Sequence, residues 1–126
     1  MSKILIVDDT PENFDILNSI LSDYETRSCL SGKHALERLE LERIQPDMVI
    51  IDYHMDTGMM GDVLCQKIRQ IPLFKDIPII FLTTKNSNSD IVKMYESGGD
   101  VILEKPMSTD IIKAAVARHL QRNQEC

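Results

Sequence analysis

Asp47-Met48-Val49-Ile50-Ile51-Asp52 is the stretch of sequence that decides the fold. Its four consecutive apolar residues, three of them β-branched, are typical of a strand that is covered on both faces in the middle of a parallel sheet. Asp52 closes this strand. Ligands of open α/β sheets bind in the crevice outside the carboxyl ends of the strands, so its position makes Asp52 a candidate functional residue.

The same alternation of strand and helix recurs along the whole chain. Apolar runs predict further strands at 3–7, 77–82 and 101–103, and a short polar–apolar segment predicts one at 25–29, at a sheet edge. Apolar residues at helical spacing, with Thr10, Ser31, Ser87 and Ser108 or Thr109 as N-caps, predict the helices. These helices are expected over 12–22, from Ser31 to Ile44, over 61–71, from Ser87 to Gly98, and from Ser108 or Thr109 to a frayed end at 123–126.

Five strand–helix units with short connections predict an α/β fold, a doubly wound parallel sheet in one domain over residues 1–126. The 14 Lys and Arg against 20 Asp and Glu give a net charge of -6 without a basic run, so no direct nucleic-acid partner is expected. Met1-Ser2-Lys3 leads straight into a strand, which predicts a cytoplasmic protein without a signal peptide or membrane contact. Three cysteines without metal spacing fit a reducing compartment.

Polar residues follow the apolar strands and carry the candidate chemistry. Asp8 and Asp9 follow the first strand, Asp52 the third, Thr83 and Thr84 the fourth, and Lys105 the fifth. Carboxylates that converge on one sheet edge repel one another unless a cation neutralises them, and a hard divalent ion such as Mg²⁺ or Mn²⁺ suits their oxygens. An aspartate can also attack phosphorus, while an amine and a hydroxyl hold phosphoryl oxygens.

Each of these residues also has a simpler interpretation. An Asp after a strand often only caps the next helix, a threonine there is often only a strand-end hydroxyl, and a Lys-Pro pair is often a loop. The hypothesis of a site therefore rests on the combination, because it needs acid, acid, hydroxyl and amine at the same end of four strands.

The sequence resembles the receiver domain of bacterial two-component response regulators (CheY-like) over residues 2 to 122. The resemblance rests on Val7-Asp8-Asp9, on Asp52 with Met55 three residues later, on Phe81-Leu82-Thr83-Thr84 and on Lys105-Pro106. It implies a flavodoxin-like (βα)5 sheet with strand order 2-1-3-4-5.

The resemblance also implies a role for each matching residue. Asp52 would accept a phosphoryl group from a histidine kinase or a histidine phosphotransfer protein. Asp9, with Asp8, Asp52 and the backbone carbonyl of His54, would bind Mg²⁺. Phosphoryl oxygens would be held by Lys105, and Thr83, with Thr84 beside it, would move toward them. A cis peptide bond would precede Pro106.

Two departures from the family pattern mark candidate tuning residues. Asp56 stands where the family usually has proline, and the loop to Gly61 is one residue longer. Ile102 stands where the family commonly has Tyr or Phe, so we expect the loop from Thr84 to Ser89 to carry the switching signal instead. His54 and Lys85 are further candidates for residues that tune the transfer or hydrolysis of the phosphoryl group.

Three classes of function follow. The preferred one is a phospho-accepting receiver that is not a turnover enzyme and that acts on a separate protein target, since no output domain follows the last helix. The second is a Mg²⁺-dependent phosphatase or phosphotransferase of haloacid-dehalogenase type, which would have an aspartate at position 54, where this chain has His54. The third is a receiver-like binding module independent of phosphorylation, which the loss of an acid or of the lysine would favour.

Overall fold

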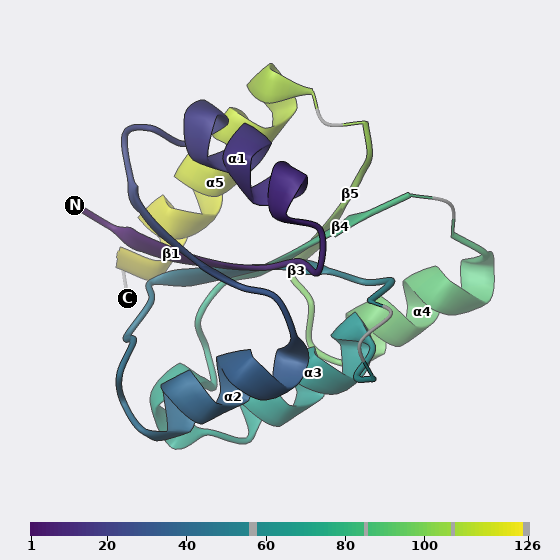
Figure 1. Cartoon of the computed structure of the whole chain (residues 1–126). Helices are drawn as coiled ribbons and strands as arrows, with labels where there is room; N and C mark the ends of the chain where they lie inside the picture. Colours follow the sequence, from purple (N-terminus) through teal and green to yellow (C-terminus); the bar gives the residue numbers. More distant parts are fainter. Residues whose placement is uncertain (56–57, 85, 107, 125–126) are drawn as a thin grey trace.

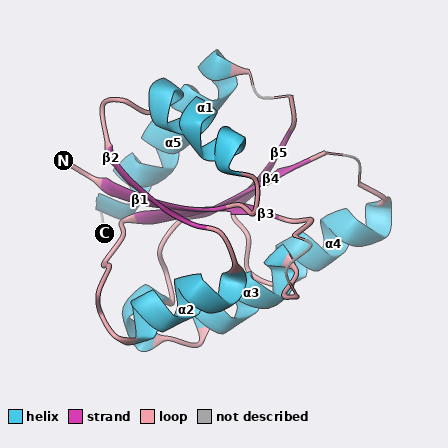
Figure 2. Cartoon of the chain, in the orientation of Figure 1, coloured by secondary structure: helices cyan, strands magenta, loops and turns pink. Residues whose placement is uncertain are grey.

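A computed structural model describes residues 1–55, 58–84, 86–106 and 108–124 and shows a central parallel sheet with helices on both faces (Figures 1 and 2). The strand order is β2-β1-β3-β4-β5, which confirms the predicted order. The edge position predicted for the second strand is also confirmed. The strands are β1 (Lys3–Val7), β2 (Glu25–Cys29), β3 (Met48–Asp52), β4 (Ile79–Thr83) and β5 (Val101–Glu104).

Helices cover both faces of the sheet, as a doubly wound fold requires. Figure 1 shows α1 and α5 on one face and α2, α3 and α4 on the other. The helices are α1 (Pro11–Ile20), α2 (Gly32–Glu40), α3 (Gly61–Arg69), α4 (Asn88–Glu96) and α5 (Thr109–Gln124), with a short 3-10 helix η1 (Pro72–Phe74).

The sheet separates two hydrophobic cores, because successive side chains of a strand point to opposite faces. Val49 and Ile51 of β3 lie in the core beneath α2, α3 and α4, whereas Met48 and Ile50 lie in the core beneath α1 and α5. All five residues of β3 are buried. The prediction that this strand is covered on both faces is therefore confirmed, and Asp52 is held at the end of a fully buried strand.

Three of the predicted caps are confirmed, among them Ser108, whose hydroxyl accepts a hydrogen bond from the Ile111 amide at 3.5 Å. The Ser31 hydroxyl accepts a hydrogen bond from the His34 amide at 3.1 Å, and Ser87 and Asp90 form a reciprocal capping box. Gly98 ends α4 with a positive φ of 108°. Thr10 precedes α1, but its side chain does not cap the helix.

Several predicted boundaries were wrong. Ile44 lies outside α2, which ends at Glu40, and two residues later Glu42 takes a left-handed φ of 55° that turns the chain. The strand predicted at 77–82 is Ile79–Thr83 instead, in keeping with the missing N–H group of Pro78. Helix α3 ends at Arg69 rather than at 71, and η1 follows it and buries Phe74. The chain is also still helical at 123 and 124, where fraying was expected.

Candidate functional site

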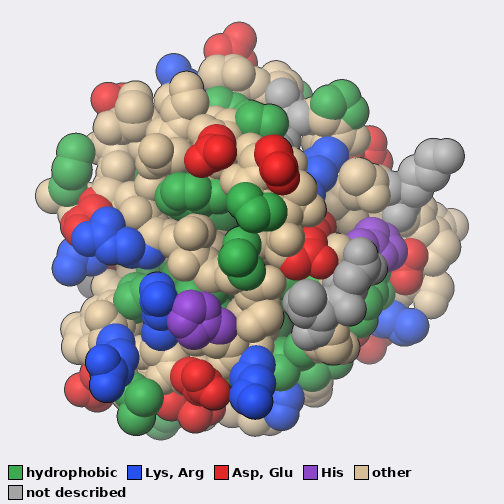
Figure 3. Space-filling view, in the orientation of Figure 1, with side chains coloured by type: hydrophobic (Ala, Val, Ile, Leu, Met, Phe, Trp, Pro, Cys, Tyr) green, Lys and Arg blue, Asp and Glu red, His purple; other side chains and the backbone are tan. Residues whose placement is uncertain are grey.

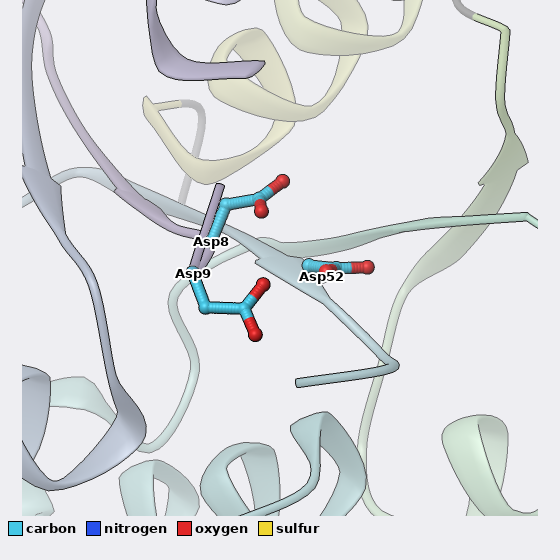
Figure 4. A group of neighbouring side chains, drawn as sticks. All are labelled: Asp8, Asp9 and Asp52. Carbon is cyan, nitrogen blue, oxygen red and sulfur yellow. The ribbon is translucent and has the colours of Figure 1, made fainter. Parts of the chain in front are cut away.

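Three carboxylates gather at the carboxyl end of the sheet. Asp8 and Asp9 directly follow β1, and Asp52 is the last residue of β3. Figure 4 shows their side chains close together, and one carboxylate oxygen from each lies within 4.8 Å of the others. Asp8 and Asp52 are only 4 % and 8 % exposed. The folded chain thus brings together the acidic residues that the sequence placed at two separate strand ends.

Lys105 supplies the positive charge of this cluster from the segment after β5. Its Nζ lies 3.1 Å from Asp8 Oδ2 and 3.5 Å from Asp52 Oδ1. The peptide bond between Lys105 and Pro106 is cis. One ammonium group among three carboxylates leaves the cluster with excess negative charge.

The carboxylate of Asp8 accepts hydrogen bonds from three donors. Its Oδ1 accepts a hydrogen bond from the Thr10 amide at 3.0 Å, and its Oδ2 accepts one from the Asn13 side chain at 3.0 Å in addition to the Lys105 ammonium. Two protein donors fix this carboxylate from the amino end of α1. The orientation of the buried Asp8 side chain is therefore set by hydrogen bonds on both of its oxygens.

The ionisation of Asp52 reflects this crowded, buried position. The pKa of Asp52 is raised to about 6, chiefly by burial and also by the negative charges of Asp8 and Asp9, while the Lys105 ammonium group opposes the rise. Ionised carboxylates in such a place favour a cation that offsets their repulsion. The donor set of the site thus fits a hard divalent metal ion.

Thr83 ends β4 beside the acidic cluster and is fully buried. Its hydroxyl donates a 2.8 Å hydrogen bond to Asn86 Oδ1, and the Asn86 amide in turn donates to the backbone carbonyl of Thr84 at 3.3 Å. The side chain of Thr84 is exposed. The Thr83 hydroxyl is therefore hydrogen-bonded to the loop before α4. Its partner there, Asn86, was not among the residues predicted from the sequence.

Tyr53 is a second residue that the sequence analysis missed. It follows Asp52 directly, is 3 % exposed, and its hydroxyl donates a 3.1 Å hydrogen bond to Asp90 Oδ1. Burial and the bond to Asp90 raise its pKa to about 12. Its ring also packs edge-on against the exposed His54, with ring centroids 4.7 Å apart. Tyr53 thus joins the end of β3 to the first turn of α4.

Of the remaining candidates, the structure describes Ile102. Ile102 is half-buried, packs against the core beneath α2, α3 and α4, and pairs in register with Phe81. Asp56 and Lys85 lie outside the described residues. Gly61 begins α3 directly against the site, since a Cβ atom there would lie 2.6 Å from the backbone oxygen of Asp52. This close approach requires glycine.

Comparisons with known proteins agree with this geometry. Residues 4–117 match the model of the response regulator receiver domain family. A Vibrio cholerae protein named "Probable cyclic di-GMP phosphodiesterase" is 37 % identical over 119 residues, which are 94 % of this chain and 26 % of that protein. The regulatory protein PhoB of Rhizobium meliloti is 35 % identical over 125 residues, 97 % of this chain and 53 % of its own length. The chain thus spans about a quarter to a half of the curated relatives it matches.

Solved structures resemble the chain over nearly all of its length. The signal receiver domain of a signal transduction histidine kinase from Syntrophus aciditrophicus has a TM-score of 0.87 and 32 % identity, and the match covers 96 % of this chain and 91 % of that one. The chemotaxis protein CheY4 of Vibrio cholerae has a TM-score of 0.85 and 26 % identity, with 94 % and 98 % covered.

Proposed function

Since the chain belongs to the response regulator receiver domain family, whose members accept phosphoryl groups, we propose that Asp52 is the residue that accepts the phosphoryl group here. The observation that carries this proposal is the contact of Asp52 with Lys105, at 3.5 Å, inside a cluster with two further carboxylates. Asp52 is the member of this cluster that ends the central strand, and it lies beside Asp8 and Asp9 (Figure 4).

The proposed reaction uses the ionised carboxylate of Asp52 as a nucleophile. One of its oxygens forms a bond to phosphorus while the bond between phosphorus and the histidine nitrogen of the donor breaks, and the donor imidazole keeps the electron pair and takes up a proton from solvent. Lys105 would hold a phosphoryl oxygen, and the Thr83 hydroxyl would leave Asn86 to hold another. The donor is a histidine kinase or a histidine phosphotransfer protein.

The acidic cluster fits a divalent cation, because hard cations prefer carboxylate and carbonyl oxygens. Asp8, Asp9, Asp52 and the backbone carbonyl of His54 would hold it. When bound, Mg²⁺ or Mn²⁺ supplies neutralisation of the charge on the transferring phosphoryl group.

Labelling with a small phosphodonor tests the assignment of Asp52. With phosphoramidate and Mg²⁺ the chain should gain one acid-stable, base-labile phosphoryl group, seen by intact mass. Asp52→Ala should abolish this gain, whereas Asp23→Ala, in the exposed turn before β2, should keep it. Label at the wild-type level in Asp52→Ala would refute the assignment.

We further propose a single receiver domain over residues 1–126, located in the cytoplasm, that alters the activity of a separate protein target and binds neither membrane nor nucleic acid directly. No helix in the described part of the chain is long and apolar enough to cross a membrane. The chain itself is proposed not to turn over an external substrate, since the phosphodiesterase name belongs to a relative of which it spans 26 %. The dehalogenase-type phosphatase and the phosphorylation-independent module are not favoured by the family match.

A further inference from the structure

A cavity of about 490 Å³ opens beside α2 and β2, and none of the proposed phosphorylation residues lines it. Its polar wall holds Arg27, Arg38, Arg43, His34 and a single acid, Glu37, while Leu41 and Ile44 form an apolar part. Figure 3 shows Lys and Arg side chains around a histidine over α2, in the lower half of the view. Three arginines against one carboxylate make this cavity locally basic in a chain whose net charge is -6.

The arginines of the cavity are poorly neutralised by the protein. Among the described residues, neither Arg38 nor Arg43 has a carboxylate within the 4.0 Å of a salt bridge, and Arg27 pairs only with Glu25, at 2.7 Å. Arg38 is half-buried and interacts with the Cys29 thiol rather than with a carboxylate, so its charge is partly desolvated without an anionic partner in the described part of the chain. An anion bound in the cavity would compensate the desolvated charge of Arg38 and could also accept hydrogen bonds from the exposed Arg43.

We propose that this cavity binds a small phosphate-bearing ligand of nucleotide size. Planar guanidinium forks match phosphate oxygens, and a cavity of about 490 Å³ lies within the usual range of small-molecule sites. The exposed Leu41 and the half-buried Ile44 would contact the apolar face of a base, and Glu37 would accept hydrogen bonds from ribose hydroxyls. An apolar wall next to the charges favours such a ligand over an acidic peptide, which needs charge alone. This binding is independent of phosphorylation at Asp52.

Titration calorimetry of the full chain tests the proposal with ATP, AMP, inorganic pyrophosphate, adenosine and a hexaglutamate peptide as probes. EDTA is present throughout, so that a metal–phosphate complex cannot form at the acidic cluster. We expect saturable binding of ATP and weaker binding of pyrophosphate, which lacks the base. Arg38→Gln and Arg43→Gln should each weaken ATP binding at least about tenfold. Arg118→Gln is the matched control, because it removes the same charge from an exposed position on α5, across the sheet.

Each other outcome overturns the proposal. These outcomes are no saturable ATP binding, an equal loss in Arg118→Gln, or undiminished binding in both cavity variants. Adenosine binding as tightly as ATP would exclude recognition of phosphate, and hexaglutamate binding more tightly than ATP would indicate a protein contact instead. Should the half-buried Arg38 be needed for folding, the exposed Arg43 gives the same test, and phosphorylation of Asp52 in each variant confirms an intact fold.

Discussion

At Asp52, burial and neighbouring charge act on one carboxylate in opposite directions. Burial and the carboxylates of Asp8 and Asp9 favour the protonated form, whereas Lys105 favours the ionised form. The first effects dominate, since the pKa rises from 3.8 to about 6. Without a cation, ionisation of Asp52 to the form that can attack phosphorus is therefore disfavoured. The proposed metal would lower the free energy of this ionisation.

This balance predicts how stability depends on pH when no metal is bound. Because the pKa of folded Asp52 (about 6) lies above its ordinary value (3.8), the folded state binds this proton more tightly, and the contribution of Asp52 to stability falls as pH rises from about 4 to 6. A difference of about 2 between these pKa values corresponds to about 3 kcal/mol. In EDTA, the unfolding free energy of Asp52→Asn should thus equal that of the wild type below pH 4. Above pH 6 it should be higher than that of the wild type by up to about 3 kcal/mol.

Urea unfolding followed by circular dichroism across this pH range measures the effect. Asp23→Asn, in the exposed turn before β2, should follow the wild-type curve. An Asp52→Asn advantage that did not grow between pH 4 and pH 6 would show that burial does not control this carboxylate.

Among the elements, β3 and α4 are joined by the hydrogen bond from Tyr53 to Asp90, at 3.1 Å. Tyr53→Phe removes this bond and keeps the ring in its core, so it should cost about 0.5–1.5 kcal/mol of unfolding free energy. The amides of the first turn of α4, which Asp90 helps to cap, should also exchange faster with solvent. Tyr95→Phe, with an exposed ring on the same helix, is the control. Unchanged exchange at the start of α4 would show that this contact does not hold the helix.

The connection between β4 and α4 is the segment in which we expect the conformational response to phosphorylation. Thr83 would exchange its bond to Asn86 for a phosphoryl oxygen, and the half-buried Ile102 lacks an aromatic ring that could fill the space it leaves. With beryllofluoride and Mg²⁺ as a phosphoryl mimic, NMR shift changes should therefore centre on Thr83 to Tyr95, and they should persist in Ile102→Ala. Their loss in that variant would identify Ile102 as the coupling residue.

Much of this arrangement follows from the sequence because parallel strands all end at one edge of the sheet. Asp8, Asp52 and Lys105 could be placed there from the strand ends alone. The bond of Tyr53 to Asp90 could not be predicted, because hydrophobic pattern does not give the direction in which a side chain turns after a strand. Helix η1 was missed for a related reason, since three residues are too few to show a helical period.

At the scale of the whole molecule, the sheet lies between two hydrophobic cores, one on each of its faces. Leu17 of α1 lies in one core and Leu64 of α3 in the other, exposed by 1 % and 0 %. Both cores use alternate residues of the same strands, so the loss of either should unfold the other. The proposal of a single domain over residues 1–126 therefore means that the two cores unfold together.

Cavity variants on the two sides test this coupling. Leu17→Ala and Leu64→Ala should each lower the unfolding free energy by about 2–5 kcal/mol, because each removes buried methyl groups and leaves space that the core fills only partly. Unfolding should remain a single transition in both variants, with circular dichroism and tyrosine fluorescence changing together, since Tyr24 packs against one core and Tyr53 lies in the other. Leu73→Ala, at a position 55 % exposed, should cost far less. Two separated transitions in Leu17→Ala would mean that the α1–α5 layer unfolds by itself and that the sheet does not couple its two faces.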